Sequence, residues 1–185
     1  MDELSLQEVQ KDIFAYSAMQ SSKLLPKNIT LDATQSESTF LDLEELKNKG
    51  LLVWDFKMKS SSWSSVVSNP KHAINCVAYY GDAETGYYCL GYAIGCISED
   101  QTLVEINFIE KRKDASAELD GKFLPVIIDA FASYALYLNK ETEANISDFV
   151  LVGPLPGVKA YYQKAGFINV ENYYKGADGM LMKLI

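Results

Sequence analysis

The sequence predicts an α+β fold, in which one mixed, mostly antiparallel sheet carries helices on both faces. Three segments of strand-like composition follow one another at 73–80, 87–98 and 102–112, and the "GDAETG" between the first two predicts a hairpin. Apolar residues then recur at helical spacing from 124 to 138. A strand, a short helix and two more strands complete the chain, which favours helices and a sheet packed as layers around one core.

The first 50 residues are predicted to be separate from the main domain. A helix is predicted over 4–19, followed by a polar connector and a second helix over 38–50, with Ser38 or Thr39 as N-cap and Gly50 as its stop. We interpret residues 1–50 as a helical extension packed on or beside the core. Residues 51–185 are then the main domain.

The other elements of the main domain are expected as follows. "LLVWDF" predicts a strand, and the serine-rich stretch after it a short helix or loop ended by Asn69 and Pro70. Since its apolar stripe is wide, the 124–138 helix is expected to lie against the sheet. Strand 148–155, helix 156–165 and strands 167–174 and 179–185 follow in order.

Composition excludes several classes of function. A hydrophobic fraction of 48% without a long apolar run is typical of a soluble globular protein, and the acidic, polar N-terminus is not a secretory signal, so we expect a cytoplasmic protein without a membrane span. One histidine and three cysteines without a CxxC pair argue against a zinc site, and the cysteines are expected to be reduced and buried. The net charge of −8 argues against nucleic-acid binding and favours a cationic ligand, such as a small molecule or a basic peptide.

Gly121 stands at the entry to the long predicted helix. The first N–H groups of a helix lack partners within it, and a glycine lets a phosphate approach them closely. Lys122 adds a cation, and Pro125 fits the first turn, where a missing N–H costs little. The segment is therefore a candidate phosphate site, or otherwise an ordinary turn into a helix.

The stretch "GPLPGVKAYYQKAGF" places Val158, Tyr161, Tyr162 and Ala165 on one side of a short helix that Gly166 ends. Taken alone, this is either an aromatic face packed on the sheet or part of a site.

The order of elements over residues 51–185, with the helix ending "YYQKAGF", resembles the GNAT superfamily of N-acyltransferases. Tyr162, Gly166 and Phe167 match the family's last helix, whereas Leu155 and Val158 replace its Asn and Ala. "GMLMKLI" is similar to the family's closing strand. Gly121 aligns with its pyrophosphate loop, with Glu118 in place of Gln or Arg and Phe123 in place of a small residue. The sequence is most similar to a divergent bacterial branch.

The resemblance implies acetyl-CoA as cosubstrate, no metal, and a set of residues for each task. Tyr162 would be the acid that protonates the leaving thiolate, Tyr161 beside it a packing residue, and Glu105 or Glu110 the base. Since the two glutamates are an odd number of positions apart, we expect only one to face the substrate, with Glu110 preferred; a solvated or paired carboxylate is the alternative for each. A backbone N–H within 151–153 would polarise the thioester. The residues expected to bind coenzyme A are Ile109, Leu119, Asp120, Gly121, Lys122, Phe123, Leu151, Val152 and Gly153.

The function that follows is acyl transfer from acetyl-CoA to an amine of a small molecule or a protein, and the acidic balance suits a cationic acceptor. A homodimer is left open. The alternative is a catalytically degenerate GNAT-fold protein that serves as a binding or interaction module, motivated by Glu118, Phe123 and the replaced asparagine. Residues 1–50 would then be a candidate partner surface.

Overall fold

A computed structural model describes residues 3–33, 36–60 and 67–184 of the chain. Its centre is a seven-stranded sheet in the order β1-β2-β3-β4-β5-β7-β6. The strands are β1 Asn28–Asp32, β2 Ala73–Asp82, β3 Gly86–Ile97, β4 Leu103–Lys111, β5 Asp148–Val152, β6 Ile168–Tyr174 and β7 Ala177–Lys183. The α-helices are α1 Glu3–Ser22, α2 Glu37–Asn48, α3 Phe56–Ser60, α4 Phe123–Glu141 and α5 Pro156–Lys164, with short 3-10 turns at Pro70–His72 and Ala117–Leu119.

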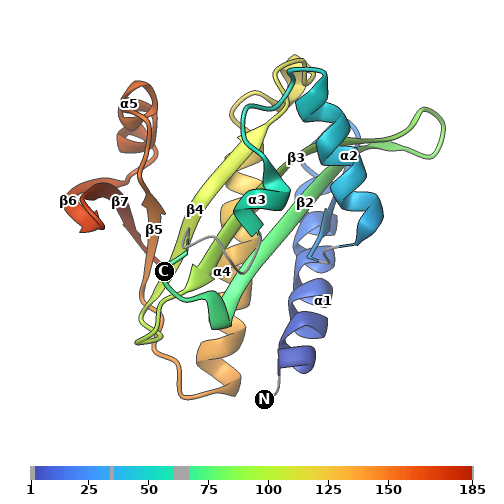
Figure 1. Ribbon diagram of the computed structural model, residues 1–185. Helices are drawn as coiled ribbons and strands as arrows, with labels where there is room; N and C mark the ends of the chain where they lie inside the picture. The colour runs from blue at the N-terminus through green and yellow to red at the C-terminus, as the bar shows by residue number, and fades with distance from the viewer. Residues whose placement is uncertain (1–2, 34–35, 61–66, 185) are drawn as a thin grey trace.

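Helices cover both faces of the sheet (Figure 1). α1 and α4 lie on one face, where Phe14 stacks on Phe131 with 5.5 Å between ring centroids. α2 and α3 lie on the other, where Leu43, Leu46 and Phe56 join a second apolar cluster. All neighbouring strands pair antiparallel except β4 and β5, which are parallel. The predicted α+β class with a mixed, mostly antiparallel sheet is confirmed.

The helix predicted over 124–138 is α4, which extends from Phe123 to Glu141. Nine of its side chains are buried against the sheet and α1, because the apolar positions form a stripe wide enough to contact both. The predicted three-strand series is β2, β3 and β4, each antiparallel to the next.

Two predictions for the first part of the chain are wrong. The polar connector contains β1, an edge strand whose alternating burial places Ile29 and Leu31 in the core. The expected strand 51–56 is instead a loop leading into α3: Leu52 and Phe56 are buried, but the N–H groups of Val53 and Trp54 bind a carboxylate rather than another strand. The apolar run reflects burial, not sheet pairing. The serine-rich prediction falls largely on residues 61–66, which lie outside the described part.

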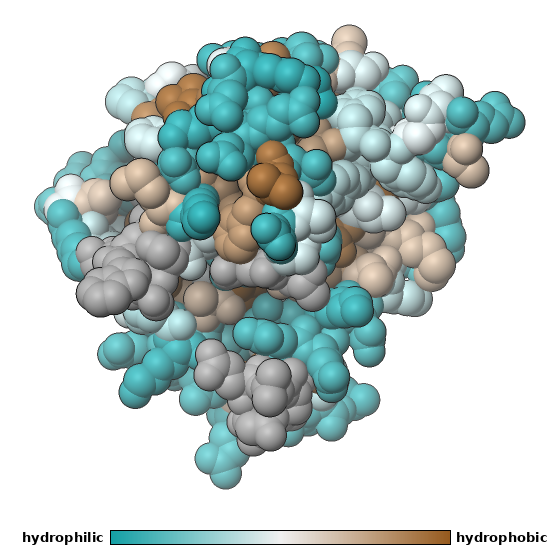
Figure 2. All heavy atoms as spheres, turned by 45° about the vertical axis from the view of Figure 1, so that its right-hand side comes forward, coloured by the Kyte–Doolittle hydropathy of each residue, from teal (hydrophilic) through white to brown (hydrophobic). Residues whose placement is uncertain are grey.

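The three cysteines, Cys76, Cys89 and Cys96, are free and buried, as expected. Burial raises the pKa of the Cys96 thiol to about 11, with a smaller contribution from Glu105, so this sulfur remains protonated at neutral pH. Across the residues that the structure describes, every helix is too short or too polar to cross a bilayer. On the face shown in Figure 2, hydrophilic side chains predominate and hydrophobic ones form small, scattered groups.

Candidate active site between two diverging strands

β4 and β5 separate at one end of the sheet. They pair in parallel from Leu103↔Asp148 to Ile106↔Leu151, although β4 continues to Lys111. In Figure 1, the upper part of β4 leans away from β5 and α5. The separation leaves a cleft of about 200 Å³. Its walls come from β4, β5, α5 and the loop before α3, with the lining residues Trp54, Ile106, Asn107, Phe108, Ile109, Leu151, Val152, Gly153, Pro154, Leu155, Val158 and Tyr162.

The cleft brings together five of the residues expected from the sequence. Tyr162, the candidate acid, shares it with Ile109, Leu151, Val152 and Gly153. The candidate bases Glu105 and Glu110, and the loop from Leu119 to Phe123, are not among its lining residues. The structure therefore gathers Tyr162 and residues of two strands, and leaves the two glutamates and the loop 119–123 outside this cavity.

A β-bulge in β4 changes the geometry of the two glutamates. Ile94 pairs with Phe108 and Gly95 with Ile106, so Asn107 is an extra residue in β4. The extra residue reverses the alternation after it. Glu105 consequently contacts Cys96 and Glu110 contacts Tyr92, and both partners lie on the α2–α3 face of the sheet. The expectation that only one of the two glutamates can face this side is wrong.

Glu110, which the sequence favours as the base, forms hydrogen bonds with the loop before α3. Its carboxylate accepts hydrogen bonds from the backbone N–H groups of Val53 and Trp54, and from the Tyr92 hydroxyl at 3.2 Å. These bonds fix the segment that carries Trp54 into the cleft. The contacts favour a structural role for Glu110 and an indirect one in shaping the site.

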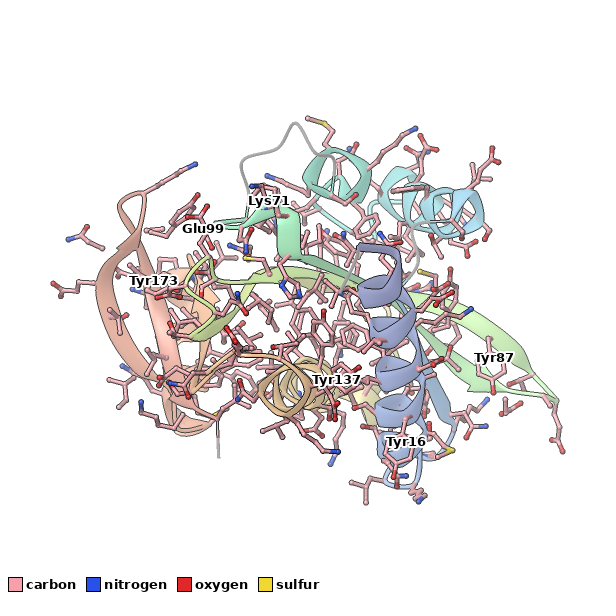
Figure 3. All side chains as sticks on the ribbon, turned by 90° about the horizontal axis from the view of Figure 1, so that it is seen from below. Tyr16, Lys71, Tyr87, Glu99, Tyr137 and Tyr173 are labelled. Atoms are coloured by element: carbon pink, nitrogen blue, oxygen red, sulfur yellow. The ribbon has the colours of Figure 1, made fainter. Side chains whose placement is uncertain are left out.

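Glu105 is almost completely buried, with 3% of its surface exposed. It accepts a hydrogen bond from the Tyr173 hydroxyl at 2.7 Å and one from the Cys96 thiol at 3.5 Å. Tyr173 extends from the β6–β7 hairpin toward the rest of the sheet (Figure 3). Desolvation, together with the hydrogen bond to Glu105, raises the pKa of Tyr173 far above its usual range. The phenol therefore stays protonated and is the donor in its hydrogen bond to Glu105.

Backbone groups of β4 face the cleft past the last β4–β5 pair. The N–H of Arg112 donates to the carbonyl of Leu90 on β3 at 2.8 Å. Successive residues of a strand direct their backbone groups to opposite neighbours. The N–H and C=O of Ile109 are therefore directed away from β3, toward the side from which β5 has separated. An extended ligand could pair with them as an added strand does.

On the other wall, β5 ends in a turn. The N–H of Gly153 donates to the carbonyl of Asp178 near the start of β7 at 2.8 Å, and its φ of +60° suits glycine. Pro154, which follows, has no N–H. By the same alternation, within 151–153 only the N–H of Val152 points toward β4. This N–H lies at the last β4–β5 pair, Ile106↔Leu151, where the parallel ladder pairs it with β4.

The two adjacent tyrosines of α5 have different environments. Tyr162 is half-buried and packs against the core, with its ring 6.0 Å from that of Phe167, whereas Tyr161 is 45% exposed. The expectation that Tyr161 is the packing residue is wrong, because the helix turns Tyr162 inward. Burial, and to a lesser degree Tyr161, raises the pKa of Tyr162, so its phenol is protonated at neutral pH and can act as a donor.

The loop before α4 has the features of an anion site. Gly121 has a φ of +69°, and nothing but the Tyr161 hydroxyl, at 3.9 Å, would meet a Cβ there. α4 begins at Phe123, two residues after this glycine; its N-cap residue Lys122 makes no side-chain cap and is exposed. The open N-terminus and its partial positive charge can accept a phosphate. Lys111 lies at the same loop, paired with Asp120 at 2.9 Å.

The two departures from the family's loop pattern are accommodated within the fold. Phe123, which stands in place of the pattern's small residue, is 6% exposed and belongs to the core. Leu119 is fully buried and anchors the loop. Glu118 accepts a hydrogen bond from the Tyr80 hydroxyl at 2.7 Å, so its carboxylate is held by β2. No group of three potential ligands placed to hold a metal ion is found within the described ranges.

Sequence reasoning missed Asn107 and Trp54 as lining residues. Asn107 owes its place to the bulge, for which the local sequence carries no signal. Trp54 lies in the segment that the sequence predicts as a strand, and only the loop conformation brings it beside Phe108, with 5.9 Å between ring centroids.

Comparison of the whole structure with solved structures identifies the fold. The Ard1 protein of Thermoplasma volcanium matches with 16% identity and a TM-score of 0.50, over 85% of this chain and 98% of that one. An acyl-CoA N-acyltransferase from Pseudomonas aeruginosa matches with 16% identity and a TM-score of 0.51, over 84% and 98%. The GNAT domain of S. lividans PAT matches with 10% identity and a TM-score of 0.51, over 85% and 90%. No family model and no curated protein matches the chain. The chain has the GNAT fold, as its sequence indicated.

Proposed function

We propose that this chain is a divergent GNAT enzyme that transfers an acyl group, in the first instance acetyl, from acyl-CoA to an amine. The observation that carries the proposal is the cleft between β4 and β5, which Tyr162 lines together with Ile109 and Val152. The open N-terminus of α4 after Gly121 supplies a place for the donor's pyrophosphate, near Tyr161 of the same helix as Tyr162.

The reaction places few demands on the protein beyond positioning. The amine nitrogen attacks the thioester carbonyl carbon, a C–N bond forms and the C–S bond breaks. A backbone N–H directed into the cleft stabilises the negative charge on the carbonyl oxygen. The phenol of Tyr162 gives its proton to the leaving sulfur, and the proton lost by the amine restores it through a base or water.

For the base, Glu105 is favoured over Glu110. Glu110 is engaged by two backbone N–H groups and the Tyr92 hydroxyl, while Glu105 accepts from Tyr173 and Cys96 only, among the contacts of the described residues. Glu105 lies on the same face of β4 as Phe108, which lines the cleft. A proton would reach it through Tyr173 or water.

A binding protein of the same fold is the second candidate. It is favoured by the absence of both glutamates from the lining of the cleft and by the Leu155 and Val158 replacements in α5. In this reading the cleft holds acyl-CoA without turning it over.

Release of the free thiol from acetyl-CoA separates the two candidates. The purified chain is assayed with a set of amines that spans a polyamine, a lysine-containing peptide and a peptide with a free N-terminus. Amine-dependent thiol release supports the enzyme. Tight acetyl-CoA binding without release for any amine supports the binding protein, and absence of binding contradicts both.

A further inference from the structure

Lys59 holds its ammonium group against two aromatic rings of the cleft wall. Nζ lies 4.5 Å from the ring centre of Phe108 and 5.0 Å from that of Trp54, and both side chains line the cleft between β4 and β5. Both distances are within the range of a cation–π interaction. A primary amine of this chain therefore lies at the edge of the cavity in which amine acylation is proposed.

The place of this amine follows from the loop before α3. The carboxylate of Glu110 accepts hydrogen bonds from the N–H groups of Val53 and Trp54, which fixes the indole beside the ring of Phe108. Lys59 comes from the last turn of α3 and is half-buried. Because a lysine stem is apolar and flexible, it can lie along such rings while its charged end stays near the open cavity.

Two other lysines near these elements are placed differently. Lys57, two residues earlier in α3, is exposed and lines a separate groove between α2 and α3. Lys159 of α5 is in an ion pair with Asp178, with 2.5 Å between Nζ and Oδ2. The contacts of Lys59 with the cleft wall are therefore not a general property of the lysines in this region.

The face of β4 that Lys59 contacts also carries the favoured base. Phe108 packs against the apolar cluster under α2 and α3, and Glu105 contacts Cys96 in that same cluster. Lys59, which lies on the Phe108 ring, is thus on the side of the sheet to which Glu105 is directed. Tyr162 lines the same cleft from the wall that α5 forms. The proposed base and the proposed acid are both near the path of this amine.

We propose that Lys59 is acylated by the chain's own site, within one molecule. The inference rests on the proposed function, which supplies acyl-CoA and the acid. The Lys59 ammonium loses a proton to Glu105 or water, and Nζ attacks the thioester carbonyl carbon. A C–N bond forms, the C–S bond breaks, and the phenol of Tyr162 protonates the leaving sulfur. Because amine and bound donor belong to one complex, the step needs no diffusional encounter with an acceptor.

The test is mass spectrometry of the wild-type chain incubated with acetyl-CoA and no added amine. We expect one acetyl group per chain, mapped to Lys59, together with one released thiol per chain. The rate should be independent of chain concentration, because the reaction is intramolecular. Lys57 reports uncatalysed acetylation of the same helix, and Lys59 should be modified at least about tenfold faster.

Lys59→Arg keeps a cation for the two rings and removes the reactive amine, so thiol release without added amine should be lost. Lys57→Arg is the matched control and should be modified at Lys59 as fast as wild type. Tyr162→Phe should slow modification of Lys59 by about 10²-fold and leave the background at Lys57 unchanged. Mapping of the wild-type chain decides the question even if a variant does not fold.

Three results would overturn the inference: modification of Lys59 no faster than of Lys57, a rate proportional to chain concentration, or an unchanged rate in Tyr162→Phe. An unmodified Lys59 in a chain that acetylates an added amine would also overturn it, and the proposed function would then stand. If wild type neither binds acetyl-CoA nor releases thiol, the proposed function itself fails, and the inference fails with it.

Discussion

Tyr162 and Tyr161 are chemically identical neighbours in α5 whose surroundings differ. Tyr162 is half-buried with a raised pKa, whereas Tyr161 is exposed at the surface of the same helix. We predict that Tyr162→Phe lowers turnover by about 10²-fold, the contribution of a positioned general acid, with little change in acetyl-CoA affinity. Steady-state kinetics and calorimetry measure the two effects separately.

Tyr161→Phe is the control for this prediction, because it makes the same chemical change one position away. It should leave turnover within a few-fold of wild type. Equal activity in wild type and Tyr162→Phe would remove Tyr162 from the acid role.

The directions of the Glu105 and Glu110 side chains could not be predicted from the sequence. Their types and their strand were predictable, but the rule that side chains alternate fails across the bulge at Asn107. A bulge is set by tertiary pairing: at this point a Cβ on Gly95 would lie only 2.0 Å from the carbonyl oxygen of Glu105. No local sequence pattern in β4 predicts this bulge.

At the scale of elements, the entry of α4 combines the proposed phosphate site with an unfavourable charge. Glu118 is exposed and lies in the turn before Gly121. We predict that Glu118→Gln tightens acetyl-CoA binding about twofold at low salt, since a unit charge about 8 Å away in water contributes about 0.5 kcal/mol. Glutamine keeps an acceptor for the Tyr80 hydroxyl. The gain should shrink in 1 M salt.

Glu143→Gln, the same change beyond the other end of α4, is the control and should have no effect. Weaker or unchanged binding in Glu118→Gln would count against the alignment of this loop with the family's pyrophosphate loop.

Elements with strong internal periodicity were predicted well, and those shaped by contacts were not. α4 and the β2–β3 hairpin follow from spacing and turn residues alone. Segment 51–56 was wrongly predicted as a strand because Leu52 and Phe56 are apolar residues buried in the core. The backbone N–H of Trp54 donates to Glu110 instead of to a neighbouring strand. β1 is short, and its exposed positions carry polar residues, so its sequence resembles that of a linker.

At the scale of the whole molecule, buried tyrosines link stability to alkaline pH. Tyr92 and Tyr134 are fully buried, and burial is the main cause that raises the pKa of both, to about 12 for Tyr134. Above pH 10 the unfolded chain releases these protons and the folded chain keeps them, so stability falls as pH rises. Each group lowers the free energy of unfolding by up to about 1.4 kcal/mol per pH unit.

Urea unfolding between pH 9 and pH 12 checks this expectation. Tyr134→Phe should flatten the decline between pH 10 and pH 12 by about one tyrosine's contribution, because it removes one group that titrates in the unfolded state alone. A variant with the wild-type slope would show that Tyr134 ionises equally in both states.

The fold class could be predicted because it follows from the order of helices and strands along the chain. The cleft could be predicted only in part: Tyr162 and the backbone of 151–153 follow from the resemblance, but the separation of β4 from β5 is a property of the assembled sheet. Binding of acyl-CoA in that cleft is the central claim, since the chemistry proposed for Tyr162 depends on it.

Calorimetric titration of the purified wild-type chain with acetyl-CoA tests this claim most directly. The account predicts saturable binding of one acetyl-CoA per chain, with a negative heat-capacity change from burial of the apolar cleft. Absence of heat at high micromolar acetyl-CoA, with the protein shown to be folded, would contradict it.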